Sequence, residues 1–375
     1  MNLFDVYPLY DVTPVSAKGI VLTDDKGQEY LDFYGGHAVI SIGHAHPLYI
    51  KSLKDQLDKI GFYSNAVHNP LQVALATKLG QVSGCEEYNL FLCNSGAEAN
   101  ENALKMASFQ TGKSRVIAFK NSFHGRTSAA VATTDNNNIN APINKQQKVT
   151  FLAFNDIIAF ENEVGKGDVC AVIIESIQGV GGLDEPSTEF FKTVQQLCKD
   201  HNTLLIADEV QSGFGRSGKF FAFQHHEINP DIITIAKGMG NGFPVGGVLI
   251  NEKIKASYGQ LGTTFGGNHL ACMATLAVLE VIEKEGLVEN AKGLGDYFLE
   301  KAKEIPQLRR TKGKGLMLGL EFDFEVAELR KKLIYEQHLF TGGAKDKRVL
   351  RILPALNITK TDMDLFFEKL KMALV

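Results

Sequence analysis

Short apolar segments alternate with amphipathic helical patterns through the middle of the chain. The apolar segments are residues 90–93, 115–119, 169–175, 204–207, 231–236 and 245–250, and helical patterns begin near residue 97 and cover 188–200. Apolar segments of this length are typical of buried strands. Strands that alternate with amphipathic helices form mostly parallel sheets with helices on both faces. The sequence therefore predicts an α/β fold.

The two ends of the chain have different patterns. Residues 19–33 are predicted to form two short strands joined by a turn at Asp24-Asp25-Lys26-Gly27. Helical patterns lie at 46–60, 70–83, 268–284, 288–303 and from 361, with further strands near 313–322 and 348–352. We therefore predict an N-terminal arm (1–45), a large domain (46–260) and a smaller α+β domain (261–375) that the arm joins.

Composition and charge narrow the functional classes. The 375 residues are 44% hydrophobic with a net charge of −4, which allows a large core and argues against a basic nucleic-acid surface. No apolar segment approaches the length of a membrane span, and the N-terminus does not resemble a signal peptide. The five cysteines are scattered without a CxxC pair, so we expect buried free thiols, no metal site and a cytoplasmic protein.

The strongest candidate chemistry lies at the ends of two predicted strands. Asp208, Glu209 and Gln211 follow the apolar segment 204–207, and Lys237 follows the segment 231–236. Open α/β sheets bind ligands at the carboxyl ends of their strands. A lysine there can form a Schiff base with an aldehyde cofactor, and an acid can keep the cofactor's ring nitrogen protonated. Each residue alone is more often a cap or a solvated strand end.

A candidate phosphate site follows the strand at 90–93. Ser95, Gly96 and Ala97 open the next helix, where free N–H groups favour an anion. The alternative is an ordinary N-cap, with Ser95 and Glu98 forming a capping box.

Three other segments carry candidate ligand-binding side chains. Phe123 or His124 could stack on a flat ring, or fill the core, and Arg126 could bind a carboxylate. Thr263 and Thr264 lie among glycines and suit a phosphate or a carboxylate, or belong to turns. Arg351 follows a short apolar segment and is either a surface residue or an anchor for an anionic substrate.

Together these motifs resemble the class III aminotransferases, which are pyridoxal-phosphate enzymes of fold type I. The resemblance covers nearly the whole chain through the motifs GQEYLDF, GHAHP, SGAEANE, FHGRT, DEVQSGFGRSG, AKGMGNG, TTFGGN and LRILPAL. Within the class, the chain is most similar to the acetylornithine and succinylornithine aminotransferases. The resemblance implies a mostly parallel seven-stranded sheet and a smaller domain built from both termini.

The resemblance also implies a role for each candidate residue. For the cofactor, Lys237 would bind the aldehyde and later act as general base, Asp208 would hold the ring nitrogen, Gln211 the ring hydroxyl, Phe123 the ring face, and Ser95, Gly96 and Ala97 the phosphate. Thr264 would reach the phosphate of the neighbouring subunit, which implies a homodimer with shared active sites. Arg126, Thr263 and Arg351 would hold substrate carboxylates. The implied reaction moves the terminal amino group of an N-acylornithine, with acetylornithine as the expected donor, to 2-oxoglutarate, giving the semialdehyde and glutamate, in arginine biosynthesis.

Three positions depart from the family pattern. Val180 replaces a glutamate that can cover the arginine matched by Arg351, while Ser176 and His269 replace prolines. Acetyl, succinyl and free ornithine donors therefore stay open, as do 4-aminobutyrate and other ω-amine donors and an aminomutase. A catalytically silent cofactor-binding protein is an alternative of another class. The sequence argues against a nucleotide-binding protein, because it contains neither GxGxxG after the first strand nor GxxxxGK[ST].

Overall fold

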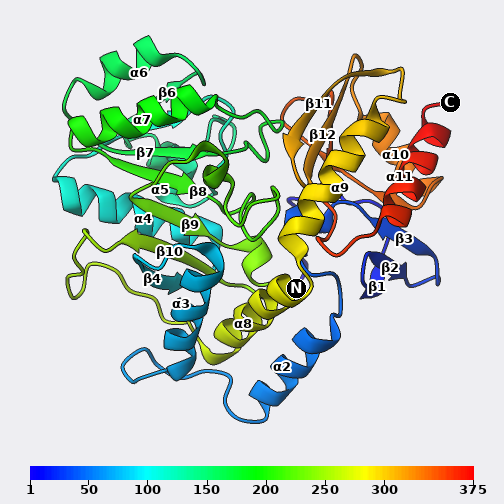
Figure 1. Ribbon diagram of the computed structural model, residues 1–375, viewed down its shortest axis with the longest axis horizontal. Coiled ribbons are helices and arrows are strands. Elements are labelled where there is room, and N and C mark those ends of the chain that lie inside the picture. Colours follow the sequence, from blue (N-terminus) through cyan, green and yellow to red (C-terminus); the bar gives the residue numbers. More distant parts are fainter.

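The computed structural model describes residues 1–375, and a seven-stranded sheet lies at its centre (Figure 1). In spatial order the strands are β4 (Tyr88–Cys93), β10 (Gly246–Asn251), β9 (Ile232–Ile235), β8 (Leu204–Asp208), β7 (Val169–Glu175), β5 (Arg115–Phe119) and β6 (Val149–Leu152). Only β10 runs antiparallel to its neighbours. The predicted mostly parallel α/β sheet is confirmed.

Helices cover both faces of this sheet because its strands are apolar on both sides. On one face α4 (Gly96–Thr111) packs its buried residues Ala99, Ala103 and Ala107 against Ile173 and Ile206. These alanines recur every four residues, so one narrow stripe of the helix approaches the sheet closely. The same side carries α5 (Ser128–Ala132), which packs on α4.

The other face is covered by larger side chains. Phe160 of α6 (Ile157–Val164) and Phe190 and Phe191 of α7 (Thr188–Asp200) belong to the main core cluster. Three further helices belong to this side of the large domain: α2 (Pro47–Leu57), α3 (Pro70–Ser83) and α8 (His269–Lys284). The helix α8 packs on both α2 and α3, which ties the C-terminal half of the chain to the N-terminal half.

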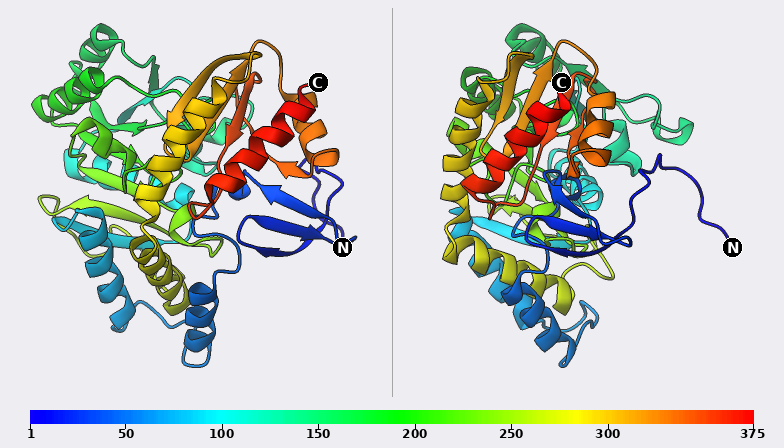
Figure 2. Two further views of the ribbon diagram at one scale, coloured as in Figure 1. Left: turned by 45° about the vertical axis from the view of Figure 1, so that its right-hand side comes forward. Right: turned by 90° about the vertical axis from the view of Figure 1, so that its right-hand side faces the viewer.

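Two small sheets form the other part of the molecule (Figure 2). One contains β11 (Leu308–Lys314), β12 (Met317–Phe322), β15 (Val349–Ile352) and β14 (Gly342–Gly343), with α9 (Leu287–Ala302), α10 (Ala327–Tyr335) and α11 (Lys360–Ala373). The other contains β1 (Pro14–Lys18), β2 (Val21–Asp24), β3 (Glu29–Asp32) and β13 (Leu339–Phe340). Because β3 pairs in parallel with β13, residues from both termini share one sheet, as predicted. The domain boundaries at 45/46 and 260/261 stay predictions.

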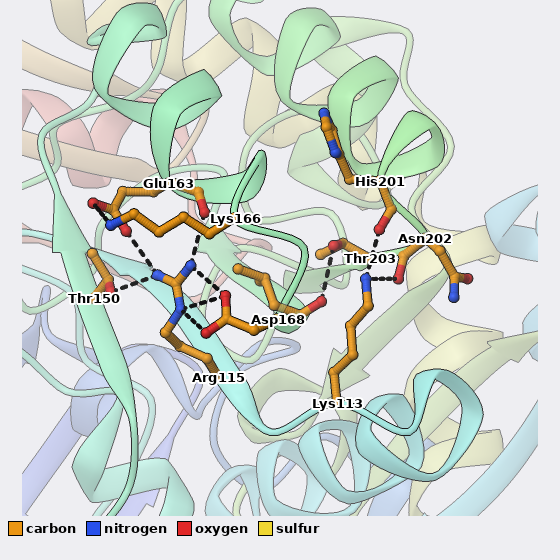
Figure 3. A network of polar contacts seen from close by, with 10 residues as sticks. Lys113, Arg115, Thr150, Glu163, Lys166, Asp168, His201, Asn202 and Thr203 are labelled. Carbon is orange, nitrogen blue, oxygen red and sulfur yellow. Dashed lines mark hydrogen bonds and ion pairs between the residues drawn. The ribbon is translucent and has the colours of Figure 1, made fainter.

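A network of polar contacts joins the amino ends of the central strands (Figure 3). The guanidinium of Arg115 contacts Asp168 at 2.7 Å and Glu163 at 2.8 Å and donates to Thr150 Oγ1 at 2.9 Å. These contacts connect β5, β6, α6 and the start of β7 at the amino ends of the strands. They hold these elements together there, and none of them involves a residue at the carboxyl ends of the strands.

Several elements differ from the sequence-based expectation. The strands β1 and β6 and the helices α6 and α10 were not predicted, and residues 313–322 are part of a hairpin of two strands, β11 and β12, rather than one strand. The hairpin turns at Gly315, whose φ of 56° favours glycine. All five cysteines are buried and free, as expected. No helix is long and apolar enough to cross a bilayer.

Candidate active site

The carboxyl ends of two neighbouring strands, β8 and β9, bring the predicted catalytic pair together. Asp208 ends β8, and Lys237 lies two residues beyond the end of β9. Both side chains line one cavity of about 400 Å³, and so does Gln211. Ser95, Gly96 and Ala97 at the start of α4 also line it, as do Phe123 and Arg126 from the loop after β5. A cavity of this size suits a small-molecule ligand.

Asp208 is held by three hydrogen-bond donors. Nδ1 of His124 and Nδ2 of Asn100 donate to Oδ2 of Asp208 at 2.7 and 2.8 Å, and the backbone N–H of Val210 donates to Oδ1 at 3.0 Å. An ionised carboxylate only accepts hydrogen bonds, and this set of donors matches that form. One further acceptor position of Oδ1 is left for a donor in the cavity. Sequence reasoning gave neither Asn100 nor His124 this role.

Lys237 has a strained backbone and a perturbed ammonium group. Its φ of 46° is unusual for a residue with a side chain, a kind of strain that is often retained at functional sites. Burial lowers the pKa of Lys237 to about 8, although Asp208 and Glu175 act in the opposite direction. About a tenth of the amine is therefore unprotonated at pH 7, far more than for a lysine of ordinary pKa, and the unprotonated form is the nucleophile.

Glu175 connects two loops that surround the cavity. Its Oε1 accepts from the backbone N–H of Phe123 at 2.9 Å, and Oε2 accepts from the N–H of Gly179 at 2.8 Å. Burial raises the pKa of Glu175 to about 7, with the nearby His124 lowering it and Asp208 raising it. The last residue of β7 thus positions both Phe123 and the segment that begins at Gly179.

The start of α4 has a serine N-cap without the full capping box. Ser95 Oγ accepts from the N–H of Glu98 at 3.2 Å, but Glu98 Oε2 accepts from the N–H of Asn94 at 2.9 Å and not from the N–H of Ser95. The N–H groups of Gly96 and Ala97 nevertheless have no acceptor in the chain. A Cβ at Gly96 would lie 2.6 Å from Cγ1 of Val210, so only glycine fits between the helix start and that side chain.

The two arginines predicted to hold carboxylates have different environments. Arg126 lines the cavity, is exposed and has no partner in the chain. Arg351 is only 3% exposed and lies behind Gly179 and Gln211. Its guanidinium donates to the carbonyl of Gly179 at 3.0 Å and to Oε1 of Gln211 at 3.4 Å. Neither arginine is paired with an acid.

Thr263 and Thr264 do not lie with the other predicted residues. Thr263 Oγ1 accepts from the N–H of Gly266 at 3.1 Å and from Nδ2 of Asn94 at 3.4 Å, and neither threonine lines the Lys237 cavity. The predicted contact of Thr264 with the phosphate of the neighbouring subunit requires a second chain and stays a prediction. The predicted binding of a substrate carboxylate by Thr263 also stays a prediction.

The three departures from the family pattern have distinct surroundings. Val180 lines the cavity, and its carbonyl accepts from the N–H of Lys345 at 2.8 Å. Ser176 Oγ donates to Glu209 at 3.0 Å, one of four hydrogen bonds that this buried carboxyl accepts. His269 is the first residue of α8, and its Nδ1 is buried without a partner.

The cavity fits a pyridine ring that carries an aldehyde and a phosphate. An amine of lowered pKa faces it from Lys237, Asp208 offers a free acceptor position, and unpaired N–H groups at the start of α4 suit a phosphate. This arrangement at the carboxyl edge of a mostly parallel sheet defines a pyridoxal-phosphate enzyme of fold type I.

Comparison with known proteins gives the family. A model of the family described as aminotransferase class III matches residues 6–374. The acetylornithine aminotransferase of Bacillus subtilis (strain 168) is 40% identical, over 100% of this chain and 97% of that protein. The acetylornithine aminotransferase of Archaeoglobus fulgidus is 39% identical, over 97% of this chain and 96% of that protein.

Solved structures are similar over almost the same length. The ornithine aminotransferase from Toxoplasma gondii ME49 has a TM-score of 0.90 and 29% identity and covers 98% of this chain and 91% of its own. An S-selective transaminase from Arthrobacter sp. has a TM-score of 0.91 and 25% identity and covers 100% of this chain and 95% of its own. This chain belongs to the class III aminotransferases, and its cofactor is pyridoxal phosphate.

Proposed function

We propose that this aminotransferase moves the terminal amino group of an N-acylornithine to 2-oxoglutarate, in arginine biosynthesis. The observation that carries the proposal is one cavity that combines Lys237 and Asp208 with an unpaired Arg126 at its side and an acid-free Arg351 behind it. Full-length relatives named acetylornithine aminotransferase support an acylated ornithine as the donor, with acetylornithine as the first to test.

The reaction is balanced without an external oxidant or reductant. The terminal carbon of the donor loses its amino nitrogen and two electrons and gains a carbonyl oxygen from water, giving the semialdehyde. The keto carbon of 2-oxoglutarate receives the nitrogen and the electrons and releases its oxygen as water, giving glutamate. Both half-reactions use the same cavity in turn.

In this proposal the cofactor, Lys237 and Asp208 each have a separate role in the reaction. Pyridoxal phosphate supplies an aldehyde that bonds to amines and a ring that accepts the electron pair of the deprotonated carbon. Lys237 would hold the cofactor through its amine and, as a free amine, would act as the general base for the substrate carbon that bears the nitrogen. Asp208 would accept a charged hydrogen bond from the ring nitrogen and so favour its protonated form.

Other residues hold the cofactor and the substrates in place. We assign the ring hydroxyl to Gln211, the ring face to Phe123 and the phosphate to Ser95 and the free N–H groups of Gly96 and Ala97, all of which line the cavity. Arg126 and Arg351 are assigned to carboxylates because guanidinium groups bind them with two parallel hydrogen bonds. Thr263 is assigned to a substrate carboxylate from the family resemblance alone.

The proposal includes a cytoplasmic homodimer with shared active sites. Thr264 is exposed and lies outside the cavity of its own chain, so a role in phosphate binding needs a second copy. Thr264→Val should therefore weaken cofactor binding only if Thr264 of the partner subunit reaches the phosphate. Titration of the cofactor-free dimer with pyridoxal phosphate measures this change.

The half-reactions test the proposed function. The holoenzyme is mixed with N-acetylornithine, N-succinylornithine, ornithine or 4-aminobutyrate, and the change in cofactor absorbance is followed before 2-oxoglutarate is added. We expect the acylornithines to react fastest and 2-oxoglutarate to restore the starting spectrum. A preference for ornithine or 4-aminobutyrate would overturn the proposed donor, and no response to any amine would favour a catalytically silent protein.

A further inference from the structure

Glu175 and Asp208 are the only acids that line the cavity. Glu175 ends β7, and its two oxygens accept from the backbone N–H groups of Phe123 at 2.9 Å and Gly179 at 2.8 Å. An ionised carboxylate only accepts hydrogen bonds, so both oxygens of Glu175 match these backbone donors. This geometry suits a side chain that holds two parts of the backbone together.

The chain that leaves β7 lies directly against the loop after β5. We call residues 178–181 the spacer segment. Nε2 of Gln178 donates to the carbonyl of Lys120 at 2.7 Å, and a Cβ built on Gly181 would lie 2.5 Å from the carbonyl oxygen of Asn121. Both acceptors belong to the loop after β5. Only glycine allows so close an approach of the two backbones at position 181.

The spacer segment also contacts the side chain of Gln211. A Cβ built on Gly179 would collide with the side-chain amide of Gln211. The guanidinium of Arg351, which is buried, donates to the carbonyl of Gly179 at 3.0 Å and to Oε1 of Gln211 at 3.4 Å. The same four residues therefore contact the loop after β5 and Gln211.

The two neighbours of the spacer segment are assigned to one rigid ligand. In the proposed function Phe123, from the loop after β5, contacts the face of the cofactor ring, and Gln211 contacts the ring hydroxyl. Groups that bind a rigid ligand must be held within about 0.5 Å of the productive geometry. The spacer segment contacts both groups, and Glu175 bonds it to the backbone of Phe123 itself.

We propose that Glu175 is a positioning residue that fixes the spacer segment, and that this segment sets the distance between Phe123 and Gln211 around the cofactor ring. Glu175 acts through the N–H groups of Phe123 and Gly179. This inference rests on the assignment of Phe123 and Gln211 in the proposed function and adds the element that holds them apart.

Glu175→Gln tests the carboxylate. One oxygen becomes an amide nitrogen, which donates and cannot accept from the second N–H group. The probe is pyridoxamine phosphate, which has the ring, hydroxyl and phosphate of the cofactor but no aldehyde, so Lys237 forms no bond with it. Its affinity for the cofactor-free protein should fall about 10-fold to 100-fold, the range for a hydrogen bond to a charged group. The visible circular dichroism of the bound cofactor should change as well.

The matched control for Glu175→Gln is Glu321→Gln. Glu321 is also almost completely buried, accepts from Arg310 and does not line the cavity. Both variants should lower the unfolding temperature of the cofactor-free protein. Only Glu175→Gln should change the affinity and the circular dichroism, which a purely structural role would not cause.

Gly181→Ala tests the spacer segment without changing an ionisable group. The added methyl group meets the carbonyl of Asn121 and should move the segment away from the loop after β5. The affinity for pyridoxamine phosphate should fall about 10-fold. The control is Gly293→Ala in α9, where an added Cβ has no atom within 4 Å, and its affinity should stay that of the wild type. Should Glu175→Gln fail to fold, Gly181→Ala decides the inference.

The outcomes separate this inference from the proposed function. Phe123→Leu and Gln211→Leu test the ring contacts directly, and wild-type affinity in both overturns their assignment and, with it, the inference. Weaker binding in these two variants, with wild-type affinity and circular dichroism in Glu175→Gln and Gly181→Ala, overturns the inference alone. An equal loss of affinity in Glu321→Gln and Glu175→Gln also overturns it, because general destabilisation then explains both.

Discussion

Nδ1 of His124 lies 2.7 Å from Oδ2 of Asp208, and both side chains are almost completely buried at the edge of the cofactor cavity. Asn100 donates to the same oxygen at 2.8 Å from the first turns of α4. The carboxylate that faces the cofactor ring is therefore oriented by two side chains from elements far apart in the sequence. Replacing Asn100 or His124 should therefore change the rate of the reaction through the orientation of Asp208 and not through a lost contact with the substrate.

His124→Phe should lower kcat about 10-fold to 100-fold, because a charged hydrogen bond that orients Asp208 is lost while the volume is kept. His124→Asn retains a donor and should recover part of the loss. The pH profile of kcat and the cofactor spectrum should both shift in His124→Phe, which a purely structural role would not cause. Wild-type kcat and spectrum in that variant would contradict the positioning role.

Asp208→Asn should reduce turnover by several orders of magnitude, because an amide cannot keep the ring nitrogen of the cofactor protonated. The shape of the side chain is conserved, so the variant should still fold and bind the cofactor. Single-turnover measurements with the amine donor follow the loss in the proton-transfer step. Near wild-type rates would show that the electron-withdrawing role belongs to another residue.

The rate at which the cofactor-free protein captures pyridoxal phosphate should rise with pH and level off above about 8. Burial lowers the pKa of Lys237 to about 8, and only the unprotonated amine attacks the aldehyde. Below this pKa the reactive fraction falls tenfold per pH unit, whereas a lysine of ordinary pKa would still be gaining reactivity near pH 10. Stopped-flow absorbance at a series of pH values gives the midpoint, and a midpoint near 10 would contradict the burial of the amine.

Arg115→Ala should destabilise the fold by about 2 kcal/mol and leave kcat unchanged. Arg115 is largely buried between Asp168 and Glu163, but Asp168 is 56% exposed, so water compensates part of the loss. Arg115 is the first residue of β5, at the amino end of the strand, whereas the cofactor cavity lies at the carboxyl ends of the strands. Denaturant unfolding measures the change, and Lys166→Ala, at an exposed partner of Glu163, is the control with little effect.

The sequence predicted the central strands and the strand-end residues because local patterns determine both. An apolar run followed by an acid or a lysine already places Asp208 and Lys237 at the carboxyl edge of a parallel sheet. The roles of Asn100 and His124 were not predicted, because their contacts with Asp208 span 108 and 84 residues and leave no local pattern.

Short or polar elements were missed for related reasons. β6 has only four residues and follows a polar loop, so its pattern is too brief to separate from the loop. The helix α10 is largely polar, and tertiary packing rather than a strong apolar stripe stabilises it. The left-handed turn at residues 35–38 includes His37 and Ala38, whose side chains disfavour that conformation, so only the folded structure reveals it.

The covalent role of Lys237 is the central claim, and reduction of the holoenzyme with borohydride tests it most directly. The reagent fixes the bond between a lysine and the cofactor, and peptide mapping by mass spectrometry then locates it. The account predicts a single cofactor adduct on the peptide that contains Lys237 and no adduct or turnover in Lys237→Ala. An adduct on another lysine, or a Lys237→Ala variant that still turns over its substrates, would contradict it.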